Sequence, residues 1–168
     1  MVQDALLKIV YGMYVITSRL DEKLNGMIAT TACQVTAEPI RMSVTVSKDN
    51  YSHRLIEESG VFGVSVLRQD TEFGFIGRFG FKTGQNTDKL ENVNYTLGRT
   101  GVPLVTDNAI ATAECRVISS HDAGSHTIFL AEVIDAKILS GEPALTYEYY
   151  HTVIKGKSPR NAPTYIAK

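Results

Sequence analysis

A period-two alternation of apolar and polar residues recurs along this chain and constrains its fold more than any other feature. Between Arg41 and Ser47 every second residue is apolar, which is the pattern of a β-strand with one buried face. Other segments either alternate in the same way or are rich in β-branched residues between turn formers. They are residues 13–18, 27–36, 61–67 and 109–117. The pattern predicts a mainly β protein.

The segment from His126 to Leu139 differs from these strands because both of its faces are apolar. Ile128, Leu130 and Ile134 point one way, whereas Phe129, Ala131 and Val133 point the other. A strand of this kind is covered on both sides. Its second cover is either a partner subunit or the chain's own helices around a closed barrel. Because helical signals are few, we predict a homodimer with this segment near the interface.

Helical periodicity is confined to two short runs, residues 52–59 and 70–79. Asn50 or Ser52 is placed to cap the first run. Residues 80–101 carry neither pattern, and a loop of that length is usually functional or disordered. These signals favour an antiparallel barrel of about six strands with two or three peripheral helices. The alternating strands and long helices of a doubly wound nucleotide-binding fold are missing.

Composition narrows the class of protein further. We expect a single domain over residues 1–168. Its net charge is −1 and it has no long run of charges of one sign, so no basic patch that would bind nucleic acid or an anionic membrane is indicated. Cys33 and Cys115 lie far apart, which argues against structural zinc and a disulfide framework and suits a reducing cytoplasm. Residues 1–10 lack the features of a signal peptide, and no apolar run reaches about 18 residues. We therefore expect neither export nor membrane spanning.

The chain has little catalytic machinery of its own, so any chemistry must come from a cofactor. Metal-ligand spacing, a nucleophile with its base, and paired acids are all missing from the sequence. Residues 47–52 place hydroxyls, a lysine and a helix start together, which is what the phosphate of flavin mononucleotide (FMN) requires. The alternative is that Asn50 or Ser52 only caps a helix and that Lys48 is a solvated surface cation.

Three further segments have both a functional and a structural interpretation. Residues 30–33 are small, so that a planar ring could approach their main chain edge-on, or another backbone could pack closely there. His126 stands at the head of a strand, where it could donate to a ring oxygen, steer a nicotinamide, or serve only as a structural hydrogen bonder. In residues 77–84, Phe81 interrupts the Gly-Lys junction that a phosphate-binding loop of nucleotide triphosphatases requires. A dinucleotide would have no domain of its own, because Gly-x-Gly-x-x-Gly is absent.

Taken in order, four segments resemble the flavin reductase-like family of FMN-binding split barrels. They are residues 25–39, 47–53, 59–67 and 124–133. The tail, residues 149–165, is similar to the branch that contains flavoredoxin and the flavin domain of high-molecular-weight rubredoxins. The similarity covers nearly the whole chain. It implies a dimeric, six-stranded antiparallel split barrel of Greek-key type that binds FMN without a covalent link.

The resemblance also implies a set of site residues. The isoalloxazine ring would be lined by Ala29, Thr30, Thr31, Ala32 and Cys33. The ribityl phosphate would be held at the junction that contains Ser47, Lys48, Asn50, Ser52 and His53. The residues that would close over the cofactor are Phe81, Lys82, Thr83 and Gly84. His126 would match the rim histidine and is the catalytic candidate, although many family members carry Asp where this chain has Ser125.

The function that the resemblance implies is an NAD(P)H-dependent FMN oxidoreductase that passes electrons to flavin or to a small redox partner such as rubredoxin. The four ligand cysteines of a rubredoxin are absent, so its iron would belong to a separate protein. A ferric or other metal-complex reductase and a non-enzymatic FMN-binding electron-transfer module remain open, as does a haem or pyridoxal-type ligand in a similar barrel. No residue pattern distinguishes NADH from NADPH, identifies the acceptor, or tells whether FMN is retained or released.

Overall fold

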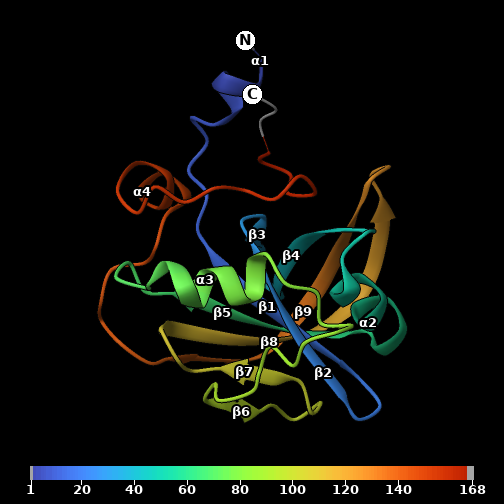
Figure 1. The fold of residues 1–168 in the computed structure, drawn as a ribbon. Helices are drawn as coiled ribbons and strands as arrows, with labels where there is room; N and C mark the ends of the chain where they lie inside the picture. The colour runs from blue at the N-terminus through green and yellow to red at the C-terminus, as the bar shows by residue number, and fades with distance from the viewer. Residues whose placement is uncertain (1, 166–168) are drawn as a thin grey trace.

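The computed structural model describes residues 2–165, which form nine strands and four helices (Figure 1). The strands are β1 (Tyr14–Leu20), β2 (Lys23–Ala29), β3 (Ala32–Ala37), β4 (Ile40–Ser47), β5 (Val61–Leu67), β6 (Tyr95–Leu97), β7 (Pro103–Val105), β8 (Ala109–Asp122) and β9 (His126–Ile138). The helices are α1 (Val2–Leu6), α2 (Tyr51–Ser59), α3 (Phe73–Gly80) and α4 (Tyr147–Thr152). The predicted mainly β fold class is therefore confirmed.

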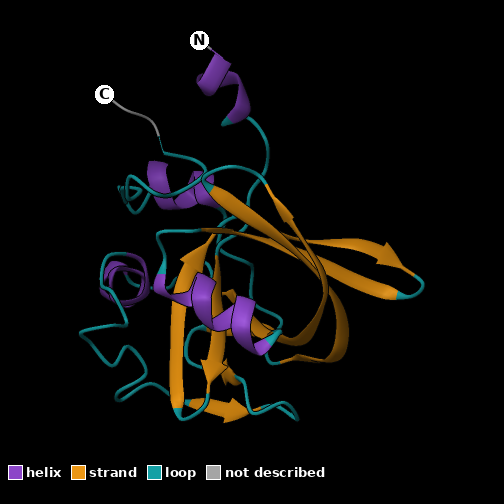
Figure 2. Cartoon of the chain, turned by 90° about the vertical axis from the view of Figure 1, so that its right-hand side faces the viewer, coloured by secondary structure: helices purple, strands orange, loops and turns teal. Residues whose placement is uncertain are grey.

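Seven strands form one antiparallel sheet in the order β2-β1-β5-β8-β9-β4-β3, and β6 pairs with β7 in a separate ribbon. The sheet is strongly curved, and the helices lie outside it (Figure 2). It has seven strands where about six were expected, because residues 27–36 are not one strand. β2 ends at Ala29 and β3 begins at Ala32, with a bend at Thr30 and Thr31 between them.

The two edges of the sheet meet at this bend. β2 and β3 are consecutive in the chain but lie at opposite ends of the strand order, so the link between them joins one edge to the other. The Thr45 N–H donates to the carbonyl of Thr31 (3.1 Å), and the Thr31 hydroxyl donates to the carbonyl of Thr45 (3.0 Å). These bonds continue the β3–β4 ladder by one residue pair beyond Ala32 and Val44. Within residues 2–165, β2 and β3 share no ladder, so the sheet closes through the link between them. This closure, which we call the seam, places Ala29–Thr31 beside Thr45–Ser47.

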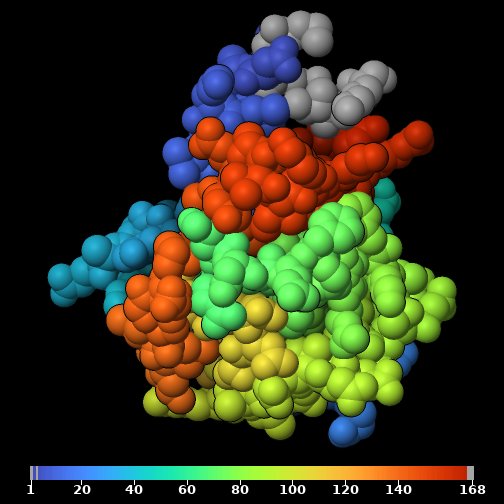
Figure 3. Space-filling view, turned by 60° about the vertical axis from the view of Figure 1, so that its left-hand side comes forward, coloured from blue at the N-terminus to red at the C-terminus, as the bar shows by residue number. Residues whose placement is uncertain are grey.

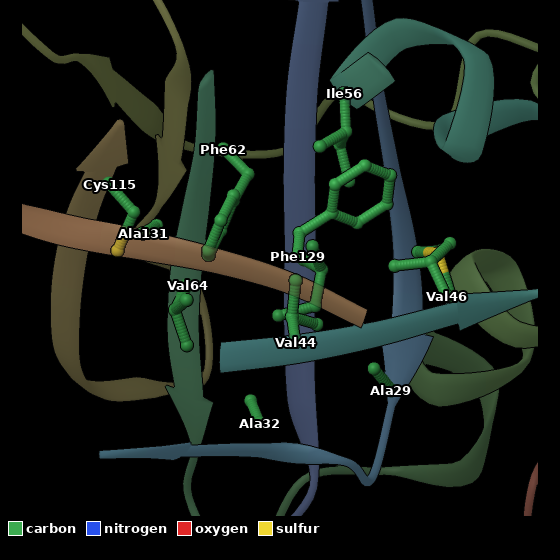
Figure 4. Packing of buried hydrophobic residues seen from close by; sticks show 12 residues of the cluster. Ala29, Ala32, Val44, Val46, Ile56, Phe62, Val64, Cys115, Phe129 and Ala131 are labelled. Atoms are coloured by element: carbon green, nitrogen blue, oxygen red, sulfur yellow. The ribbon is translucent and has the colours of Figure 1, made fainter. Parts of the chain in front are cut away.

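Two groups of buried apolar side chains hold the chain together. The first fills the inside of the curved sheet, where Val44, Ile56 and Phe129 meet (Figure 4). The second lies outside the sheet, beneath α3 and α4, and includes Ile76 and Tyr150. Burying side chains of this size stabilises the fold by roughly 1.5–3 kcal/mol each. The second group matters most for function, since it fixes α3 and α4 next to the seam.

The two predicted helical runs are present as α2 and α3. The side chain of Asn50 caps α2 by accepting a hydrogen bond from the N–H of Ser52 (3.0 Å), and the helix ends at Gly60, whose φ is 70°. α3 begins at Phe73, a few residues later than expected. α1 and α4 were not predicted, because five or six residues are too few to establish a helical period. None of the helices within residues 2–165 has the length and apolar character needed to span a bilayer.

Two buried charged side chains anchor the long segment that lacked periodicity. Lys89 donates to the carbonyls of Gly26 (2.9 Å) and Phe79 (3.0 Å), and burial lowers the pKa of Lys89 to about 8. The carboxylate of Glu114 accepts hydrogen bonds from the Thr100 hydroxyl and from the N–H groups of Thr100 and Arg99. Burial acts to raise the pKa of Glu114, but these three bonds together hold it below its ordinary value. The segment is thus an ordered part of the fold.

Candidate functional site

A cavity opens at the seam, between the sheet, the end of α3, α4 and the C-terminal segment. The space that the centre of a water-sized sphere can reach inside it is about 60 Å³, and all space between atoms, open solvent at the mouth included, is about 650 Å³. Figure 3 shows the C-terminal residues, in red, lying directly over the green surface of α3 and the loop that follows it. The site is therefore built from parts of the chain that are far apart in sequence.

The walls of the cavity differ in polarity. The wall formed by the seam is polar and carries Thr30, Thr31, Thr45 and Ser47, with Asn50 at the cap of α2. The wall formed by α3 and β2 is mostly apolar, and its side chains include Met27, Ile76, Phe79 and Phe81. A ligand that combines a flat apolar ring with polar atoms along one edge matches this division, because each part meets a wall of its own kind.

Two buried hydroxyl groups of residues that line the cavity have no partner within residues 2–165. Thr30 in the seam and Thr164 in the C-terminal segment are each 8% exposed, and neither hydroxyl oxygen makes a hydrogen bond within residues 2–165. A buried polar atom without a partner costs about 1–3 kcal/mol. Isoalloxazine carries nitrogen and oxygen atoms along its pyrimidine edge, so a flavin placed here could satisfy both hydroxyls. The residues present thus fit that group.

The structure brings six of the fourteen predicted cofactor residues to the cavity, and these are Ala29, Thr30, Thr31, Ser47, Asn50 and Phe81. Ala32 and Cys33 lie beyond the bend and line a separate outer groove with Tyr14. Cys33 is exposed, with its sulfur 3.4 Å from the Ser43 hydroxyl. The bend at the seam separates these residues, because it redirects the chain from one edge of the sheet to the other.

Three residues of the predicted phosphate junction bond to neighbouring protein groups. The ammonium of Lys48 is exposed and lies 2.7 Å from the Asp122 carboxylate, and the hydrogen bond from Lys48 holds the pKa of Asp122 below its ordinary value. Ser52 is fully buried, and its hydroxyl accepts a hydrogen bond from the Asn25 side chain (2.8 Å). His53 is also buried, with Nε2 2.7 Å from the Thr127 hydroxyl. Ser52 and His53 thus fix α2 to the sheet.

The loop after α3 has one half-buried predicted residue and three exposed ones. Phe81, Lys82 and Thr83 are exposed, and of these only Phe81 lines the cavity. Gly84 is half-buried, and any side chain there would collide with the amide of Asn25. Because Asn25 in turn bonds to Ser52, the glycine lets the loop approach the start of α2.

His126 sits at the rim of the cavity but does not line it. Its Nε2 lies 3.2 Å from the carbonyl oxygen of Asn161, and its Nδ1 lies 2.8 Å from the Ser125 hydroxyl. A carbonyl can only accept, so Nε2 carries the proton and Nδ1 accepts from Ser125. Ser125 therefore orients the ring, and His126 holds the C-terminal segment through Asn161, which lines the cavity.

Sequence reasoning missed the C-terminal wall. The sequence places the tail in a family branch and predicts no part for it in the site, yet seven of the eight residues 157–164 line the cavity, together with Tyr147 and Tyr150 of α4. Periodicity gives no signal for a segment that has neither helical nor strand geometry. Its placement depends on hydrogen bonds to tyrosines, which no local pattern reveals.

The comparisons with known proteins agree with this geometry. A family model described as a flavin reductase-like domain matches residues 6–156. The ferric-chelate reductase (NAD(P)H) of Archaeoglobus fulgidus is 44% identical over 97% of this chain and 96% of its own. The high molecular weight rubredoxin of Moorella thermoacetica is 40% identical over 96% of this chain and 70% of its own. Among solved structures, the NADH:FAD oxidoreductase of Streptomyces globisporus has a TM-score of 0.78 and 27% identity, with 86% of each chain covered.

This chain therefore belongs to the flavin reductase-like domain family. The resemblance stated from its sequence is confirmed.

The two neighbouring threonines of the seam give a direct test of the cavity's unsatisfied polarity. We expect Thr30→Val to leave the free energy of unfolding of the ligand-free protein unchanged or to raise it by about 1 kcal/mol, because the Thr30 hydroxyl has no partner to lose. Thr31→Val is the matched control, and it should lower that free energy by about 1 kcal/mol because the bond to Thr45 is lost. Urea denaturation of both variants measures the difference. Equal destabilisation by the two substitutions would contradict the assignment.

Proposed function

We propose that this protein is an NAD(P)H-dependent flavin oxidoreductase that binds FMN without a covalent link in the cavity at the seam. The observation that carries the proposal is the pairing of a polar seam, with its unpartnered Thr30 hydroxyl, and an apolar wall from α3. The names of the relatives support it, because those of the Archaeoglobus and Streptomyces proteins specify a nicotinamide donor.

In this proposal the two walls orient the flavin ring. Thr30 and Thr31 face its polar edge, while Ile76 and Phe79 pack against its apolar part and exclude water. A bound flavin accepts a hydride from a reduced nicotinamide and can release electrons singly or in pairs. The protein contributes placement and electrostatics, and the cavity mouth leaves a route for the donor.

The phosphate end of FMN is proposed to lie at the start of α2. Ser47 and Asn50 line the cavity there, and the first N–H groups of a helix favour an anion. Lys48 is the cation nearest in sequence, and its ion pair with Asp122 competes with the phosphate for the same ammonium. Ser52 acts indirectly, since its buried hydroxyl positions Asn25 and the loop at Gly84.

His126 is proposed to affect the nicotinamide donor indirectly. Its ring bonds to Ser125 and to the carbonyl of Asn161, so it sets the position of the C-terminal segment at the cavity rim.

A ferric chelate is the second candidate for the electron acceptor, beside free flavin or a rubredoxin-like protein. The name and 44% identity of the Archaeoglobus relative favour it. The rubredoxin-like alternative is supported by the Moorella relative, whose chain extends beyond the matched part. Steady-state rates with ferric chelates, free flavin and an added rubredoxin compare the three acceptors directly.

We also propose that the protein works as a homodimer in the cytoplasm. The outer groove is lined mainly by apolar side chains, including Met42, Val66 and Ile138, of which Ile138 is 87% exposed. On β9 one face is buried in the core, whereas Ile128 and Leu130 on the other face are only half-buried. A second copy would cover these groups. Both cysteines are free, which suits a reducing compartment.

The test of the proposed function is an anaerobic reduction. Protein reconstituted with FMN should lose the yellow absorbance of oxidised flavin when NADH or NADPH is added, because hydride transfer reduces the ring. Free FMN at the same concentration is the control. If the colour persists with both nicotinamides but is bleached by a reduced protein donor, the enzyme proposal is contradicted. That result would support a flavin-binding electron-transfer module.

Two substitutions locate the phosphate. Lys48→Ala should weaken FMN binding by about tenfold, a modest loss for a partly exposed charge, and Asp122→Asn should strengthen it because the ammonium is released. Riboflavin lacks the phosphate and should bind both variants as it binds the unaltered protein. Fluorescence titration of the unaltered protein and both variants with each ligand measures these six affinities. Equal changes for FMN and riboflavin would place the phosphate elsewhere.

A further inference from the structure

The C-terminal residues Lys157–Thr164, which we call the strap, line the cavity and lie over the surface of α3 and the loop that follows it (Figure 3). They lie beyond residues 6–156, the part of the chain that the family model matches. The family model does not describe the strap, although the Archaeoglobus relative aligns over 97% of this chain, so the role of the strap has to be derived from its own contacts.

Side chains of α4 and β9 hold the strap at its beginning, middle and end. Tyr150 donates to the carbonyl of Lys157 (3.0 Å), and His126 donates to the carbonyl of Asn161 (3.2 Å). The hydroxyl of Tyr147 bonds to the Ser158 hydroxyl and donates to the carbonyl of Thr164 (3.2 Å). These partners bind mostly backbone carbonyls, so they fix the path of the strap and leave its side chains free to face the cavity.

Gly156 marks the point where the strap leaves α4. Its N–H donates to the carbonyl of Tyr150 (2.9 Å), and any side chain at this position would collide with the Tyr150 ring. The chain therefore turns tightly over Tyr150 and is directed across the cavity from there.

The strap presents one unsatisfied polar group to the cavity. The Thr164 hydroxyl is buried and has no hydrogen-bond partner within residues 2–165, although the Thr164 carbonyl is bonded to Tyr147. Of the three buried hydroxyls without a partner in this part of the chain, Thr30 and Thr164 line the cavity and Ser65 does not. A structural strap gains nothing from burying such a group, whereas a strap that binds a ligand does.

We propose that the strap is a wall of the flavin site, in which Thr164 bonds to the polar edge of the ring and the closed strap retains FMN through turnover. This inference rests on the proposed function. It makes FMN a fixed cofactor, so electrons leave for an acceptor that docks at the cavity mouth, and release of reduced FMN is not part of the cycle. That outcome favours a ferric chelate or a redox protein over free flavin as the acceptor.

The test measures the association and dissociation rates of FMN by stopped-flow fluorescence. Thr164→Val should raise the dissociation rate about 3- to 10-fold, the effect of one neutral hydrogen bond, and leave the association rate unchanged. Thr164→Ser keeps the hydroxyl and should restore the original rate. Tyr147→Phe loosens the strap, so both rates should rise by about tenfold, because the strap must open for entry as well as exit.

Two controls separate this role from general destabilisation. Ser65→Ala removes the unpartnered hydroxyl that lies away from the cavity, and Tyr149→Phe removes the hydroxyl of a tyrosine of α4 that does not line the cavity. Both should leave the two rates unchanged. A merely structural role for Tyr147 would not raise the association rate. Rates within about twofold of the original in all strap variants, or slower association in Tyr147→Phe, would overturn the proposed role of the strap in FMN retention. The proposed function would remain intact. Failure of the unaltered protein to bind FMN at all would overturn the proposed function itself.

Discussion

The closure of the sheet at Thr30 and Thr31 is the constraint on which the rest of the structure depends. Two hydrogen bonds between Thr31 and Thr45 extend the β3–β4 ladder back to the end of β2, the strand at the opposite edge of the sheet. Because this contact is local, the edges are free to separate on either side of it. The same contact brings a row of hydroxyls to the outside of the barrel, where α3 can cover them with an apolar surface. Fold and site thus have a common origin.

The strands could be predicted from the sequence because each of them carries its own period. The alternation from Arg41 to Ser47 places Val44 and Val46 in the core, as the structure does. The bend inside residues 27–36 could not be predicted, because β-branched residues continue through Thr30 and Thr31 and conceal it. That bend is also why Ala32 and Cys33 lie in the outer groove and not in the cavity.

Short-range spacing predicts one part of the site, the junction between a strand and a helix. Ser47 and Asn50 lie where a strand meets a capped helix, a signal that short-range spacing carries. Ser52 and His53 share that junction, but their side chains turn to Asn25 and Thr127, which are distant in sequence. The strap is held in place by hydrogen bonds from the hydroxyls of Tyr147 and Tyr150. Periodicity does not encode such contacts.

The central claim is that FMN occupies the space between the seam and the strap. Hydrogen exchange of the backbone amides with and without FMN tests it most directly, since bound ligand slows local opening. The account predicts that FMN slows exchange at Thr30, Thr31 and Ser47 and at the residues of 157–164 other than its two prolines. Exchange at Thr100, which bonds to Glu114 away from the cavity, should not change. Protection confined to the outer groove around Tyr14 and Ile138, or no protection at all, would contradict it.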